Sequence, residues 1–218
     1  MMSERVSRLP WIRFLVVGLL VALDLWSKDA AFARFAPPGD GTLADGMLLD
    51  SHGHPRFAVM GEWLTMMLSY NPGAAWGSLG DYPYFLVIGR VIAVLLLAWL
   101  VIKTERGQGV MLPALVLVLA GALGNLHDNL FLEPRGGHPF GSVRDFIDVY
   151  FGGSYDYHFP TFNVADSCIS VGAVLLLLSG LFGKSKAETN EDDSQMEQTS
   201  DGEPASEPSR VEAGLAEE

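Results

Sequence analysis

Four long apolar segments constrain the fold of this chain more than any other feature. Each approaches the roughly 20 residues that a helix needs to cross the hydrocarbon core of a membrane. Glycines at positions 121 and 124 permit close helix contact in the third segment. The sequence therefore predicts a mainly α membrane protein with four transmembrane helices, at about residues 10–30, 84–102, 110–132 and 162–182.

The first segment also has features of a cleavable signal peptide, because basic residues precede a short apolar centre. We favour a first transmembrane helix, since three more apolar segments follow and Asp24 and Lys28 fit a cleavage site poorly. These two residues are four positions apart, so on a helix they share one face and can pair. Such a pair lowers the cost of both charges in lipid.

Basic residues flank the apolar segments on one predicted side of the membrane. The positive-inside rule makes that side cytoplasmic, so both termini are expected there and the 35–82 and 133–160 connections on the outer side. Arginines in those connections weaken the bias. The basic flanks are Arg5, Arg8 and Arg13, then Lys103 and Arg106, then Lys184 and Lys186; the arginines of the connections are Arg34, Arg56, Arg135 and Arg144.

Outside the four segments, the composition indicates loops, a small platform and a tail. Residues 35–61 are rich in Pro, Gly and Asp and predict an exposed loop with little structure. Residues 62–80 predict a short strand and turn at the membrane interface, and the family resemblance given below implies that this segment is a small periplasmic β platform. Residues 184–218 hold three basic and eleven acidic residues, so most of the net charge of -12 belongs to a disordered cytoplasmic tail. Residues 1–183 form the membrane domain, and no nucleic-acid partner is indicated.

Carboxylates concentrate in residues 142–166, at Asp145, Asp148, Asp156 and Asp166. Two close carboxylates cannot both ionise easily, so one of them keeps a proton. The ionised one can then take a proton from water while the protonated one polarises a carbonyl, which is aspartic peptide hydrolysis without metal or cofactor. Ionisable residues in spans also mark transporters and proton relays, and a structural membrane subunit is a further alternative.

Arg90 falls inside the second apolar segment. One interpretation is a side chain that snorkels to the membrane interface. The other is a group that holds an anionic lipid or substrate.

Five ordered motifs resemble those of the lipoprotein signal peptidase (signal peptidase II) family, bacterial membrane aspartic endopeptidases. The resemblance covers about residues 10–183, and five motifs in this order are highly specific. They are Asp24-Leu-Trp-Ser-Lys28, Asn71-Pro-Gly-Ala-Ala-Trp-Gly77, Gly121-Ala-Leu-Gly-Asn125-Leu-His-Asp128, Val143-Arg-Asp145-Phe-Ile-Asp148 and Phe162-Asn163-Val-Ala-Asp166-Ser167.

This resemblance implies that Asp145 and Asp166 form the catalytic pair. The substrate would be a diacylglyceryl-modified prolipoprotein, cut before its lipidated cysteine, in the bacterial inner membrane near the periplasmic face. We expect a monomer that contacts membrane lipid. The family pattern implies substrate-binding or support roles for Asp24, Lys28, Asn71, Gly73, Asn125, Asp128 and Asn163.

One departure from the family pattern concerns the residue after Asp128. The family usually has arginine there, whereas this chain has Asn129. The Asp128 carboxylate then lacks its expected partner, and we hypothesise that Arg135 or Arg144 substitutes. The stretch between Asp128 and Asp145 is also longer than usual, as is the 35–61 loop.

Overall fold

The structure is a computed structural model that describes residues 11–35, 46–49, 54–61, 63–73, 81–105, 109–134, 138–152 and 157–180. Almost all of them belong to one compact unit, Met1–Ser179. The second unit, Gly180–Glu218, lies outside the described residues except for Gly180. The predicted acidic tail and Asp156 therefore also lie outside them, and the disordered tail stays a prediction.

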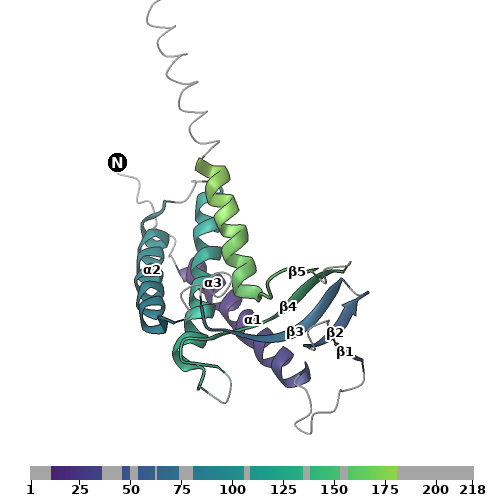
Figure 1. The fold of residues 1–218 in the computed structure, drawn as a ribbon. Coiled ribbons are helices and arrows are strands. Elements are labelled where there is room, and N and C mark those ends of the chain that lie inside the picture. The colour runs from purple at the N-terminus through teal and green to yellow at the C-terminus, as the bar shows by residue number, and fades with distance from the viewer. Residues whose placement is uncertain are drawn as a thin grey trace, which may run out of the picture. The chain divides into compact units, whose positions relative to one another are not determined.

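Within the described residues, four helices occur where the four apolar segments predicted them. They are α1 (Trp11–Phe35), α2 (Pro83–Lys103), α3 (Met111–Phe131) and a C-terminal helix, Val164–Gly180. The α3 helix packs against both α1 and α2 (Figure 1). It also contacts the C-terminal helix, because a Cβ atom at Gly121 would lie 2.3 Å from the carbonyl oxygen of Ala165. Close packing at this glycine was predicted, and it is confirmed.

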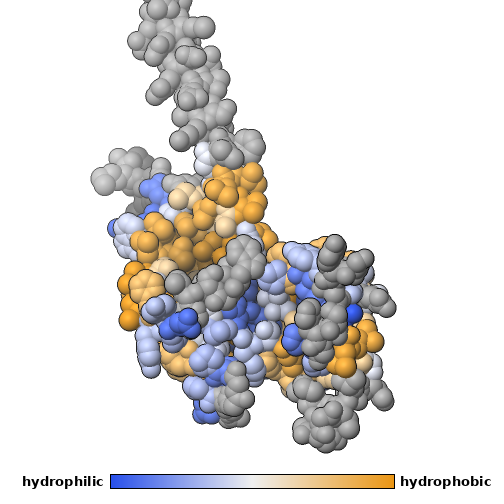
Figure 2. All heavy atoms as spheres, viewed as in Figure 1, coloured by the Kyte–Doolittle hydropathy of each residue, from blue (hydrophilic) through white to orange (hydrophobic). Residues whose placement is uncertain are grey.

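Two of the described helices, α2 and α3, are long and apolar enough to cross a membrane. Large apolar side chains on α2 are well exposed, with Phe85 69% and Leu95 65% accessible. Apolar residues cover much of the helical region in Figure 2, as expected of a lipid-facing surface. The C-terminal helix is shorter and α1 carries internal charges, so neither meets the same criterion. The prediction of four spans is thus supported for two helices.

In the part of the chain that the structure describes, five antiparallel strands form one sheet in the order β1-β2-β3-β4-β5. This sheet corrects two predictions, because the 35–61 and 133–160 connections are not simply loops. The strands of the first connection are short, and the ten-residue strand of the second pairs with a segment distant in sequence, so the pairing is not apparent from local composition. The strands are β1 (Met47–Leu49), β2 (Pro55–Met60), β3 (Leu64–Asn71), β4 (Val143–Gly152) and β5 (Tyr157–His158). The strand predicted within 62–80 is confirmed as β3.

The pairing of β3 with β4 positions the carboxylates. These strands are neighbours in the sheet although α2 and α3 separate them in the chain (Figure 1). An isolated bridge then joins Ile147 on β4 to Phe162, just before the C-terminal helix, with hydrogen bonds of 2.8 and 3.0 Å. This bridge brings the start of that helix beside the middle of β4.

Candidate active site

Asp145 and Asp166 come from different elements that meet at this junction. Asp145 lies on β4 opposite Ser69 of β3, and its side chain is almost wholly buried. Asp166 lies in the first turn of the C-terminal helix. A strand and a helix start thus present one carboxylate each, and both line the same cavity.

Asn163 and Asp166 cap the C-terminal helix reciprocally. The Asn163 Oδ1 atom accepts a hydrogen bond of 2.8 Å from the backbone N–H of Asp166, and the Asp166 Oδ2 atom accepts one of 3.2 Å from the backbone N–H of Asn163. This is a capping box, in which each side chain satisfies an N–H group that the helix leaves unpaired. The cap fixes the position of both side chains relative to the helix axis.

Two asparagines connect the two carboxyl groups. The Asn163 Nδ2 group donates to Asp145 Oδ1 at 2.7 Å and to Asn125 Oδ1 at 3.1 Å. The Asn125 Nδ2 group donates to Asp166 Oδ1 at 2.8 Å. Because an amide carries both donors and acceptors, the chain Asp145–Asn163–Asn125–Asp166 is continuous.

Lys28 supports this bridge from α1 as a fully buried cation. Its Nζ atom lies 2.8 Å from Asp24 Oδ2, 3.5 Å from Asp128 Oδ2 and 3.1 Å from Asn125 Oδ1. The contact with Asn125 is a hydrogen bond, and the contacts with the two carboxylates are ion pairs that offset the buried positive charge. The predicted pairing of Asp24 with Lys28 is confirmed. Asp24 also accepts a bond of 2.8 Å from the backbone N–H of Ala165, which ties α1 to the C-terminal helix.

Arg144 is the partner of Asp128. Its Nη2 and Nε atoms lie 2.9 and 3.2 Å from the two carboxylate oxygens, and its backbone N–H donates to Asp128 at 3.0 Å. A fork of this kind is the strong form of a carboxylate ion pair. Arg144 also pairs with Asp29 at 2.5 Å. The hypothesis that Arg144 replaces an arginine at position 129 is confirmed for its contact with Asp128, and Arg135 lies outside the described residues.

The cavity at this junction has a volume of about 990 Å³, at the upper end of the size of small-molecule sites. Its polar lining includes Asn71, Gly73, Arg90, Asn125, Asp145 and Asp166, and apolar side chains of the C-terminal helix complete the wall. All the predicted site residues except Asp24, Lys28, Asp128 and Asn163 therefore line it, and those four stand directly behind the lining. The rest of the Asn71 motif, residues 74–77, lies outside the described residues.

The environment of Asp145 favours its protonated form. Burial and the negative charge of nearby Asp166 raise the pKa of Asp145 to about 7, against the opposing effects of hydrogen bonds from Asn163 and Asn71. One carboxyl of the pair can therefore hold a proton near neutral pH while the other is ionised. This arrangement can act as an acid and a base on one bond.

Several contacts were not predicted from the sequence. Thr65 donates to Asp148, and His158 Nδ1 lies 2.8 Å from the same carboxylate. Asp148 thus belongs to the interior of the sheet. Arg90 does not snorkel outward, because its guanidinium donates to Asn129 and to the Gly73 carbonyl oxygen and lines the cavity. The only signal for its role in the sequence was a charge inside an apolar segment.

Comparison with known proteins gives consistent results. The family model of signal peptidase (SPase) II matches residues 16–182. The lipoprotein signal peptidase of Pseudomonas aeruginosa (strain UCBPP-PA14) is 33% identical over 85% of this chain and 95% of its own length. That of Coxiella burnetii (strain RSA 493 / Nine Mile phase I) is 37% identical over 78% and 88%. A solved bacterial membrane enzyme has a TM-score of 0.60 and 29% identity, with 80% of this chain and 90% of that chain covered.

Proposed function

The chain belongs to the signal peptidase II family of aspartic peptidases, and from this premise we propose that it removes the signal peptide from diacylglyceryl-modified prolipoproteins with Asp145 and Asp166 as its catalytic pair. The observation that carries this proposal is the asparagine bridge. It holds two carboxyl groups from different elements in one cavity, with the pKa of Asp145 raised to about 7. No metal or cofactor is needed for the chemistry that follows.

In the proposed reaction, water attacks the carbonyl carbon of the residue before the lipidated cysteine. The ionised carboxylate of the pair takes a proton from that water, and the protonated carboxyl donates its proton to the carbonyl oxygen. The tetrahedral intermediate then collapses as the cysteine nitrogen accepts a proton from one carboxyl of the pair, the C–N bond breaks, and a hydroxyl of the intermediate returns its proton to the other carboxylate, which restores the pair. The products are a signal peptide with a new carboxylate and a lipoprotein with a free amino group.

We also propose that α1, α2, α3 and the C-terminal helix all cross the inner membrane. Arg13 near the start of α1 donates to the carbonyl oxygens of Val101 and Thr104 at 2.5 and 2.8 Å, so the start of α1 lies beside the end of α2. Lys103 lies at that same end, and the positive-inside rule makes it cytoplasmic. Asp166 begins the C-terminal helix and Asn125 lies near the end of α3, which supports a site towards the periplasmic face. A monomer suffices for this site.

The test is cleavage of a purified diacylglyceryl-modified prolipoprotein by the detergent-solubilised protein. We expect wild type to cut before the lipidated cysteine, and Asp145→Asn and Asp166→Asn to lose activity by at least about 1,000-fold. Asp148→Asn is the matched control, because Asp148 lies on the same strand but contacts Thr65 and His158. Normal cleavage by folded Asp145→Asn or Asp166→Asn would show that the pair is misassigned. An inert wild type on every lipidated substrate would reject the proposed activity.

A further inference from the structure

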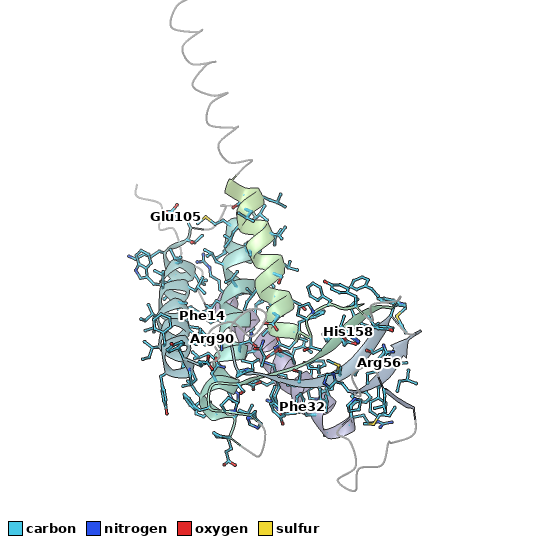
Figure 3. The ribbon with its side chains drawn as sticks, viewed as in Figure 1. Phe14, Phe32, Arg56, Arg90, Glu105 and His158 are labelled. Carbon is cyan, nitrogen blue, oxygen red and sulfur yellow. The ribbon has the colours of Figure 1, made fainter. Side chains whose placement is uncertain are left out.

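Arg90 is a cation within the most apolar helix of the described chain. It lies on the side of α2 that faces the other helices (Figure 3). A charge in a membrane-spanning helix is costly and persists where it has partners or a function. The partners of Arg90 should therefore show whether it has a function besides holding the helices together.

Arg90 and Asn129 together join four segments of the chain. Nη1 donates to Asn129 Oδ1 on α3, and Nη2 donates to the Gly73 carbonyl oxygen at 3.1 Å, just after β3. Asn129 is itself fully buried, and its Nδ2 group donates to the Gly141 carbonyl oxygen at 2.6 Å, just before β4. A planar guanidinium fixes its acceptors in direction as well as distance. Arg90 and Asn129 thus link α2 and α3 to the ends of the two strands that hold the site.

This linkage reaches Asp145 through Asn71. The Gly73 backbone N–H donates to Asn71 Oδ1 at 3.0 Å, which closes a tight turn. The Asn71 side chain also hydrogen-bonds the Asp145 carboxyl. The Arg90 bond to the carbonyl of Gly73 therefore holds the turn that presents Asn71 to Asp145. The Arg90 charge also interacts with the carboxylates of both Asp145 and Asp166.

We propose that Arg90 is a positioning residue of the active site, which acts with Asn129 to hold the Asn71 turn against Asp145 and to keep one positive charge beside the carboxyl pair. This inference rests on the proposed peptidase function. It predicts that Arg90 affects both the rate and the pH dependence of cleavage. A cation that only stabilises the packing of the helices would affect neither.

The experiment compares Arg90→Met with Arg13→Met in the prolipoprotein cleavage assay. Arg13 is the matched control, because it also donates to backbone carbonyl oxygens. Its acceptors lie at the C-terminal end of α2, whereas Arg90 lies in the N-terminal half of that helix. We expect Arg90→Met to lower kcat by about 10- to 100-fold, since small displacements of catalytic groups cost that much, with KM changed less than about threefold. We expect Arg13→Met to alter thermal stability but leave kcat within about twofold.

The pH profile separates the charge of Arg90 from its geometry. Loss of a cation favours the protonated form of both carboxyls, so both limbs of the kcat profile of Arg90→Met should move up by about half to one pH unit. Arg90→Lys keeps the positive charge but loses the planar guanidinium. The two limbs of its pH profile should therefore stay where they are in wild type, while kcat falls. In Arg90→Met/Asn129→Arg the guanidinium returns from α3, because position 129 contacts the Arg90 group directly, and part of kcat should recover.

Three results decide the matter. A kcat within twofold of wild type and an unmoved profile in both Arg90→Met and Arg90→Lys would overturn the inference and leave Arg90 as a structural tether. If Arg90→Met does not fold, a normal kcat in Arg90→Lys alone would do the same. Full activity in Asp145→Asn, measured in parallel, would instead show that the catalytic pair is misassigned, and an inert wild type would show that the proposed function has failed.

Discussion

Replacement of Asp145 by asparagine should stabilise the folded protein while it abolishes cleavage. The carboxyl is buried beside Asp166, and both conditions oppose its ionisation. An amide of nearly the same shape carries no charge and can still accept the bond that Asn163 donates to Asp145 Oδ1. The wild type therefore loses stability at any pH where the Asp145 carboxyl is ionised in the unfolded chain, and the loss is complete once the pH exceeds the folded pKa.

The magnitude follows from the shift in pKa. Folding raises the pKa of Asp145 from 3.8 to about 7, and each pKa unit corresponds to about 1.4 kcal/mol. A group with a raised pKa in the folded state contributes its stability at low pH and loses it as the pH rises through the folded value. The gain from Asp145→Asn should thus be about 4 kcal/mol at pH 8 and about 1.5 kcal/mol at pH 5. The altered bond with Asn71 offsets about 1 kcal/mol of this gain at both pH values.

The single cysteine of the chain provides the assay. Cys168 is buried in the C-terminal helix two residues after Asp166, so a thiol-reactive dye reports the loss of packing at the site itself. At about 2 to 4 °C per kcal/mol for a domain of this size, we expect the unfolding midpoint of Asp145→Asn to exceed that of wild type by about 5 to 10 °C at pH 8 and by much less at pH 5. Glu105→Gln, an exposed change at the far end of α2, is the control. An equal difference between Asp145→Asn and wild type at both pH values would refute the reasoning.

Other predictions concern the residues behind the cavity. Arg144→Leu leaves the buried Asp128 carboxylate without its fork, so the free energy of unfolding should fall by about 3 to 5 kcal/mol, measured by denaturant titration in detergent. Gly121→Ala places a Cβ atom 2.3 Å from a backbone oxygen and should cost about 1 to 3 kcal/mol, whereas Gly18→Ala meets open space and should not lower the thermal midpoint; equal midpoints would contradict the proposed close packing. Asn129→Arg in the wild-type background sets two guanidinium groups together, so cleavage should fall; normal cleavage would show that the site tolerates the second charge.

The helices could be predicted from the sequence because their signal is local. Runs of about 20 apolar residues fix a helix without reference to any other part of the chain, and the described helices begin or end within a few residues of the predicted limits, apart from the end of α1. The spacing of Asn163 and Asp166 likewise encodes the capping box within one helix turn. The meeting of these residues with Asp145 in one cavity followed from the family resemblance and not from local pattern.

The sheet could not be predicted in the same way. The β4 strand pairs with β3 across two intervening helices, and such pairing leaves no mark at a fixed spacing in the sequence. Its composition, with Val143, Phe146, Ile147, Val149 and Tyr150, does favour a strand, but the segment was expected to be a loop because it lies between two predicted membrane helices. The β1 and β2 strands are shorter and lie in a connection rich in Pro and Gly, where local composition favours a turn.

The buried charges of the site balance in pairs, and this balance explains the presence of Arg90. Asp24 has Lys28 at 2.8 Å and Asp128 has Arg144 at 2.9 Å, so these four residues are neutral together. The two carboxyls of the proposed pair, if they share a proton, carry one further negative charge, and a buried charge needs a counterion. Among the described residues that line the cavity, Arg90 is the cation that remains for it. The same charge that makes α2 an unusual membrane helix therefore completes the electrostatic balance of the proposed catalytic pair.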